Sequence, residues 1–294
     1  MPALRATVKE APSISRATIL RPKKVGRREM HLLSSCETSA ALLALYHPSV
    51  WDVKEQKLLS TTPAQHPLAT HPEAVALVLQ PLRGTVDVMD RMGVLKRHPV
   101  VLLKETDNWK RVPFNYIGDL LLFLADEAGL YVVNWTVKAT QAAFKRPGPC
   151  RRIPHTGEDD AAAELRHLIE EIYYSDAGIR TVRISGDLIN LDVIYNLTDL
   201  FQSHARTLDV SETIKAGVLS RFRDSIGTGI PAYKLISQIT RDYDINFEAA
   251  RVILKQGIWS RDLRVDLYHP ILMDRPLRTE ERDVIDEYSD WFTK

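Results

Sequence analysis

The chain has 294 residues, of which 45% are hydrophobic and 26% charged, and its formal net charge is +1. These values are typical of a globular protein, and no run is long and apolar enough to cross a bilayer. Cys36 and Cys150 are isolated, which excludes a disulfide framework and a zinc site built on cysteine pairs. We expect a two-domain cytoplasmic protein with no leader segment and no membrane partner.

Basic residues are concentrated at the start of the chain. Residues 1–30 contain eight Lys or Arg against two Glu, so the rest of the chain carries about −5. Prolines and the lack of periodicity predict a flexible basic arm over residues 1–28. Such an arm can contact nucleic-acid phosphates or simply keep a tail soluble. Because the body lacks a strong positive charge, we expect that any action on DNA is helped by another component that places the protein there.

The first predicted elements are a helix and a strand. Ser34 or Ser35 can cap a helix that runs to about Tyr46. Glu37 lies in its first turn, where a carboxylate favours the helix dipole, so a structural role is its default interpretation. Residues 50–56 alternate and predict a strand.

The next segment is less regular. It contains a loop rich in Pro, His and Thr, two short helices, a strand and a polar turn, which we expect at residues 61–72, 72–80, 86–92, 100–103 and 105–110.

Two apolar runs then predict a β-hairpin. Residues 120–125 and 130–137 flank a turn that contains Gly129. Both runs are nearly continuous in apolar residues, so we expect a sheet covered on both faces. The polar exceptions are Asp119 at the start of the first strand and Asn134, Thr136 and Lys138 on one face of the second.

An acid and a lysine at adjoining strand ends fit a metal-dependent phosphodiesterase. In such an enzyme Asp119 would hold a divalent cation and Lys138 would orient or activate water. A hairpin with ordinary polar residues at its edge is the alternative.

After the hairpin the chain predicts a basic, proline-rich loop over residues 139–160. The basic side chains of this loop could either contact phosphate or simply be solvated by water. They are Lys145, Arg146, Arg151 and Arg152. A helix capped by Asp159 or Asp160 and ending at Tyr174, a strand over 179–184 and a helix over 188–201 would complete an α/β domain ending near residue 203.

The C-terminal third differs from the rest of the chain in its predicted secondary structure. Three short helices over 212–222, 232–240 and 247–256 and a strand over 263–267 predict a small winged-helix-like domain within residues 208–275. Such a domain binds DNA or protein. The last residues, 276–294, are predicted to form a charged tail whose weak apolar stripe could dock on a partner.

Several motifs in a fixed order carry a resemblance to a known family. They are Leu32-Leu33-Ser34 with Glu37, the strand end Lys54-Glu55-Gln56, the turn His98-Pro99, and Asp119 followed by Thr136-Val137-Lys138. Over about residues 28–200 the chain resembles TnsA, the endonuclease subunit of multi-component cut-and-paste transposons. The family has Arg at the position of Lys54 and Gln at that of Thr136.

The resemblance implies a PD-(D/E)xK nuclease domain over residues 29–203, with a restriction-endonuclease-like mixed sheet flanked by helices. It implies that Glu37, Asp119 and Thr136, with the Val137 carbonyl, hold Mg²⁺ or Mn²⁺, and that Lys138 helps to activate water. Hard oxygen ligands suit these ions. Thr136 is short and neutral, so three alternatives stay open. A second metal could be held weakly, Asn134 could replace Thr136 as a ligand, or the chain could be an inactive copy of the enzyme.

The resemblance also implies the partners. The chain would cut the 5′ strands at transposon ends, beside a DDE transposase of the TnsB type and an AAA+ ATPase regulator of the TnsC type, in the bacterial cytoplasm at the nucleoid. The alternatives are a stand-alone restriction or repair endonuclease, a non-catalytic adaptor of a transposition complex, and an unrelated α/β protein.

Overall fold

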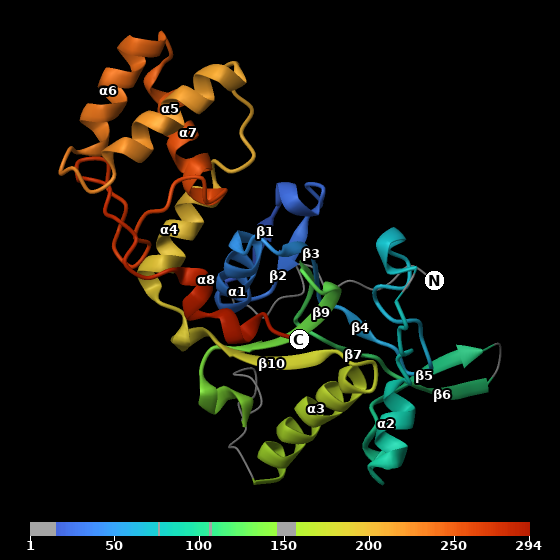
Figure 1. Cartoon of the computed structure of the whole chain (residues 1–294). Coiled ribbons are helices and arrows are strands. Elements are labelled where there is room, and N and C mark those ends of the chain that lie inside the picture. Colours follow the sequence, from blue (N-terminus) through green and yellow to red (C-terminus); the bar gives the residue numbers. More distant parts are fainter. Residues whose placement is uncertain (1–15, 76, 106–107, 146–156) are drawn as a thin grey trace.

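The computed structural model describes residues 16–75, 77–105, 108–145 and 157–294 (Figure 1). The strands are β1 Thr18–Leu20, β2 Met30–Leu32, β3 Val50–Glu55, β4 Leu58–Leu59, β5 Val100–Glu105, β6 Asn108–Pro113, β7 Tyr116–Ile117, β8 Leu120–Asp126, β9 Gly129–Lys138 and β10 Arg180–Ser185. The α-helices are α1 Ser35–Tyr46, α2 Thr85–Arg91, α3 Gly157–Ser175, α4 Leu191–Phe201, α5 Glu212–Ser225, α6 Ala232–Tyr243, α7 Phe247–Trp259 and α8 Val284–Glu287.

A four-stranded mixed sheet in the order β10-β9-β8-β3 forms the centre of the fold. Strand β9 runs parallel to β10 and antiparallel to β8, which is also antiparallel to β3. Helices α1 and α4 cover one face and α3 covers the other (Figure 1). The predicted mixed sheet flanked by helices is confirmed.

The β8–β9 hairpin forms as its sequence predicts. Asp126 pairs with Gly129 across a two-residue loop, and Gly129 adopts φ +116°, a region open to glycine. Along β8, Leu120 and Leu122 face the core under α1, whereas Leu121 and Phe123 face the core under α3. The apolar runs are continuous because both faces of the hairpin are covered.

Helix α1 also matches its prediction. The Ser34 hydroxyl accepts a hydrogen bond from the Glu37 amide (3.1 Å), and the Glu37 carboxylate accepts one from the Leu33 amide (2.9 Å). This reciprocal cap satisfies backbone donors at the helix start. From Ala40 to Tyr46 every residue is buried, so the second half of α1 is enclosed by the core.

The flexible arm predicted over residues 1–28 is wrong for residues 18–28. Strand β1 pairs with β2, and a 3₁₀ turn, Lys23–Val25, lies between them. Arg28 forms an ion pair with Glu55 (2.7 Å). These tertiary partners order a segment whose own sequence has no periodicity, and residues 1–15 lie outside the described part.

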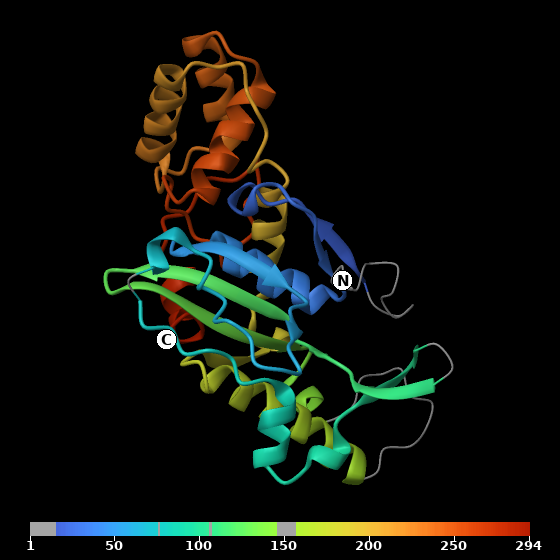
Figure 2. The ribbon, with the colours of Figure 1, turned by 90° about the vertical axis from the view of Figure 1, so that its right-hand side faces the viewer.

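Two expectations for residues 72–110 are also corrected. The expected helix over 72–80 is only a 3₁₀ turn, Pro72–Ala74, among the described residues. In the range of the expected polar turn, 105–110, Glu105 belongs to β5 and residues 108–110 belong to β6, and these two strands pair as a hairpin that projects from the body (Figure 2). Its residues Leu102 and Trp109 are exposed, with 58% and 65% of their surfaces accessible, so cross-strand pairing rather than burial defines this hairpin.

Helices α5, α6 and α7 are present, but the strand expected over 263–267 is wrong. Val265 forms only an isolated bridge with Thr279. The alternation in this segment reflects burial, because the side chains of Leu263, Val265 and Leu267 point into the core. Among the described residues, no neighbouring strand extends the backbone pairing beyond this bridge. The three helices form a bundle beside the sheet (Figure 2), and α7 packs against α4, so the apolar core continues between the two units.

The C-terminal segment packs against its own chain, which corrects the expectation of a tail that docks on a partner. Phe292 is buried and stacks on His47 with ring centroids 4.1 Å apart. The Trp135 indole donates a hydrogen bond to the Trp291 carbonyl (2.8 Å). In the described part of the chain, no helix combines the length and apolarity needed to cross a membrane.

Candidate active site

The site lies where β8 begins and β9 ends. One carboxylate oxygen of Asp119, just before β8, accepts hydrogen bonds from the Val137 amide (2.7 Å) and from the Lys138 ammonium (3.3 Å). Antiparallel pairing produces this meeting, because Leu120 lies opposite Trp135. The structure thus brings together Asp119 and Lys138, which are 19 residues apart.

Lys138 is held by two oxygen acceptors. Its ammonium donates to the Val137 carbonyl (3.0 Å) as well as to Asp119. The side chains of Lys138 and Asp119 are 29% and 20% exposed. A ligand from solvent can therefore reach both groups.

Glu37 approaches the site from the start of α1. Burial, followed by the negative charge of Asp119, raises the pKa of the Glu37 carboxyl. Its two oxygens also accept from the Leu33 amide and the Ser34 hydroxyl (3.1 Å). Glu37 therefore caps the helix and contributes charge to the site at the same time.

Thr136 and Asn134 lie on the same face of β9 as Lys138, but they are not joined to Asp119. Thr136 is 3% exposed, and in the described chain its hydroxyl makes no hydrogen bond to Glu37, Asp119 or Lys138. The Asn134 amide donates to Glu170 on α3 (2.9 Å). Strand pairing of Leu120 with Trp135 places Thr136 beside Asp119 along the backbone, but among the described residues no hydrogen bond joins the two side chains.

Glu170 is a site residue that the sequence reasoning missed. It is 4% exposed, and a Cβ atom at Gly118 would lie 3.0 Å from its carboxylate oxygen. Burial, followed by the charge of Asp119, raises the pKa of Glu170 to about 7. The sequence held one signal that could have identified Glu170. It is a carboxylate on the apolar, buried face of α3, next to Ile169 and one turn before Tyr173, where charged residues are rare.

His167, one turn before Glu170 on α3, was also missed. Burial, followed by the positive charge of Lys138, lowers its pKa to about 4. Its ring nitrogen Nδ1 is buried and has no hydrogen-bond partner among the residues that the structure describes. His167 is therefore a neutral side chain beside the lysine at neutral pH.

Gln56 fixes the backbone at the edge of the site. Its backbone amide donates to the Asp119 carbonyl (2.9 Å), and its side-chain amide donates to the His31 carbonyl (2.7 Å). The residue adopts φ +49°, which is uncommon outside glycine. Gln56 thus ties the end of β3 to the residue that begins β8.

The described residues contain no group of three or more His, Cys, Asp or Glu side chains placed to hold a metal ion. The oxygens that converge are those of Asp119 and the Val137 carbonyl, with Glu37 nearby, and the Lys138 ammonium already binds the first two. These are hard donors arranged around a positive charge. They fit Mg²⁺, which commonly takes one or two carboxylates and keeps several waters.

Comparison with known proteins does not identify the chain. No protein-family model matches the sequence, and no curated protein is detectably similar to it. The functional argument therefore depends on the geometry of the site.

Proposed function

We propose that the chain is a metal-dependent DNA endonuclease of the TnsA type, with a restriction-endonuclease-like PD-(D/E)xK domain and a winged-helix-like C-terminal domain. The observation that carries the proposal is the contact of the Asp119 carboxylate with the Val137 amide and the Lys138 ammonium at adjoining strand ends. Glu37 adds a second carboxylate from α1. The motif order in the sequence and this convergence agree.

The chain's own groups have distinct tasks in this proposal. The Val137 amide holds the Asp119 carboxylate in one orientation. The Lys138 ammonium orients the attacking water and stabilises negative charge on the phosphate. A bound Mg²⁺ or Mn²⁺, held by Asp119, Glu37 and the Val137 carbonyl, would activate water and offset charge on the scissile phosphate.

The proposed substrate and partners follow from the same resemblance. The enzyme cuts the 5′ strands at transposon ends in the bacterial cytoplasm, with a TnsB-type DDE transposase and a TnsC-type AAA+ ATPase. The formal charge of +1 supports delivery to DNA by partners, because a protein that binds DNA alone usually carries a marked positive charge.

Strand-specific mapping of breaks tests the proposal. Labelled transposon-end DNA is incubated with Mg²⁺ or Mn²⁺, the transposase and ATPase encoded beside this gene, and either wild-type protein or Asp119→Ala. The matched control is Asp126→Ala, at the exposed far end of the same strand β8. We expect 5′ cuts from the wild type and the control and none from Asp119→Ala, whereas unchanged cutting by Asp119→Ala would overturn the proposal.

A non-catalytic adaptor is the second candidate. The Lys138 ammonium already binds the Asp119 and Val137 oxygens that a metal would need, which favours it over an autonomous enzyme. It predicts that Lys138→Ala leaves transposition unchanged. A stand-alone restriction or repair nuclease would instead bind naked DNA tightly and in a salt-sensitive manner.

A further inference from the structure

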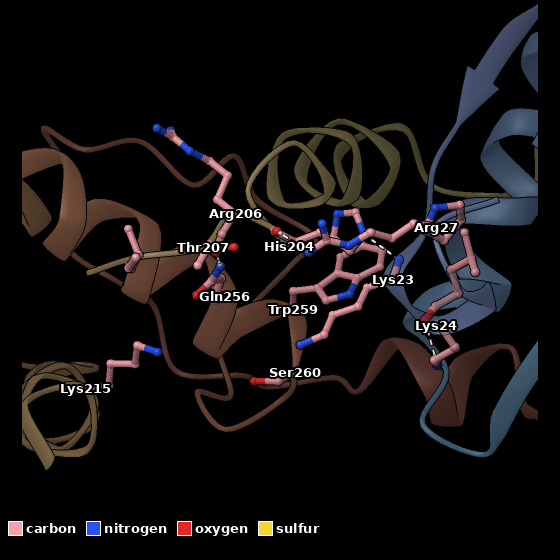
Figure 3. A pocket seen from close by; sticks show the side chains of 14 residues that line it. Lys23, Lys24, Arg27, His204, Arg206, Thr207, Lys215, Gln256, Trp259 and Ser260 are labelled. Carbon is pink, nitrogen blue, oxygen red and sulfur yellow. Dashed lines mark hydrogen bonds between the residues drawn. The ribbon is translucent and has the colours of Figure 1, made fainter. Parts of the chain in front are cut away.

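A cavity of about 650 Å³ lies between the sheet unit and the helical bundle (Figure 3). Segments far apart in sequence form it: the turn after β1, the end of α1, the chain that follows α4, one residue of α5, and the end of α7. Its volume is in the range of pockets that hold small ligands. The candidate active site contributes none of the residues that line it.

The lining is strongly positive. It contains Lys23, Lys24, Arg27, Arg206 and Lys215, and none of its fourteen residues is Asp or Glu. Lys23 and Arg27 enter from the side opposite to Lys215 (Figure 3). Basic side chains therefore line the hollow from opposite sides.

The cations of the turn after β1 lack carboxylate partners in the described part of the chain. The Lys24 ammonium donates to the carbonyls of Leu45 (2.8 Å) and His47 (2.7 Å), and Arg27 donates to the Ala205 carbonyl (3.1 Å). Carbonyl oxygens satisfy the hydrogen bonds but do not cancel the charge. Burial accordingly lowers the pKa of Lys24 to about 8.

The other two cations have partners that an anion can replace. Arg206 pairs with Glu248, and Lys215 pairs with Glu212 (2.6 Å), but neither carboxylate lines the cavity. Glu212 is 88% exposed. Exposed ion pairs of this kind contribute little stability, so both cations can turn to a ligand in the hollow.

We infer that this cavity binds a phosphate group. Several Lys and Arg side chains, together with the hydroxyl-bearing residue Thr207 in the lining, match the charge and acceptor oxygens of phosphate. The phosphate can belong to a DNA backbone or to a free compound such as a nucleotide or pyrophosphate. A bound phosphate would join the turn after β1 to α5 and the segment after α4, and so fasten the bundle to the sheet unit.

The cavity and the candidate active site lie at opposite ends of α1. Glu37 is in the first turn of the helix and Leu45, which lines the cavity, is in the last. At 1.5 Å per residue these positions are about 12 Å apart along the axis. The inferred site is thus separate from the proposed cleavage chemistry and does not depend on it.

Calorimetric titration of the full chain with inorganic pyrophosphate, at constant ionic strength, tests the inference. The double variant carries both Lys23→Ala and Lys215→Ala. The control is Lys234→Ala, because Lys234 is an exposed residue of α6 that lies outside the cavity. We expect saturable binding by the wild type and the control, and at least about tenfold weaker binding by the double variant, because two charged contacts are lost. Equal binding by all three proteins, or no saturable binding by the wild type to pyrophosphate or to DNA, would overturn the inference.

A second arm distinguishes the sources of the phosphate. Fluorescence anisotropy of a short labelled duplex is measured with each protein in an Asp119→Ala background, so that the result does not depend on cleavage. Duplex binding that pyrophosphate displaces and the double variant loses identifies the DNA backbone as the ligand. Binding of pyrophosphate alone, lost in the double variant, identifies a free phosphate compound.

Discussion

The two ends of α1 differ in electrostatic character. At its first turn Glu37 lies near Asp119, and burial and like charge raise the pKa of Glu37. At its last turn the Lys24 ammonium contacts the Leu45 carbonyl, and burial lowers its pKa. One end therefore favours a cation and the other an anion. A single helix keeps opposite ligand preferences apart, because its rigid backbone prevents the two groups from neutralising each other.

Removing the cation at the acidic end is expected to have the largest effect. Lys138→Ala should reduce 5′-strand cutting by about 10²- to 10⁴-fold, because the water-orienting group is lost. Cutting of labelled ends measures the effect, and native gel shifts check that assembly with transposase and ATPase persists. Lys54→Ala is the control, because the partly exposed Lys54 side chain on β3 pairs with Asp52. Full activity of Lys138→Ala would leave the acidic end without a catalytic role.

Weakening the helix between the two ends should disturb both. Leu43 is fully buried in the middle of α1, so Leu43→Ala should lower the free energy of unfolding by about 2–5 kcal/mol through lost burial and a cavity. Urea denaturation measures the change. A loss under about 1 kcal/mol would mean that the core around α1 collapses to fill the space.

The buried carboxyl beside the acidic end predicts a pH dependence. The folded-state pKa of Glu170 is raised from 4.5 to about 7, so the folded protein binds its proton more tightly than the unfolded chain. The wild type should lose stability as pH rises from about 4.5 to 7 and then level off. Glu170→Gln keeps an acceptor for Asn134 and should remove this loss, on the order of 3 kcal/mol. Parallel stability curves of wild type and variant from pH 5 to 8 would contradict the assignment.

The smallest expected effect concerns the cap of α1. Ser34→Ala removes the acceptor for the Glu37 amide and should cost about 1 kcal/mol of unfolding free energy. Thermal denaturation at several pH values measures it. Ser34→Thr, which retains a hydroxyl acceptor, should behave nearly like the wild type, and an equal loss in both variants would show that the hydroxyl is not the stabilising group.

Local sequence determined the elements whose signals lie within a few residues. Ser34 and Glu37 specify the start of α1, and the loop before Gly129 specifies the β8–β9 hairpin. The alternation along β9 also placed Asn134, Thr136 and Lys138 on one face. These features form as predicted because capping, turn geometry and side-chain alternation are properties of short segments.

Only the tertiary structure decided the rest. Glu170 reaches the site because α3 packs across β9, and Phe292 is buried because α8 and the turn after it lie against the sheet. The basic residues of the first thirty were visible in the sequence, but the cavity they line requires α5 and α7 as its other wall. Such contacts join residues far apart in the sequence, 36 positions for Asn134 and Glu170 and more than a hundred for Trp135 and Phe292, so no local pattern encodes them. They form when several elements bury apolar surface together in one continuous core.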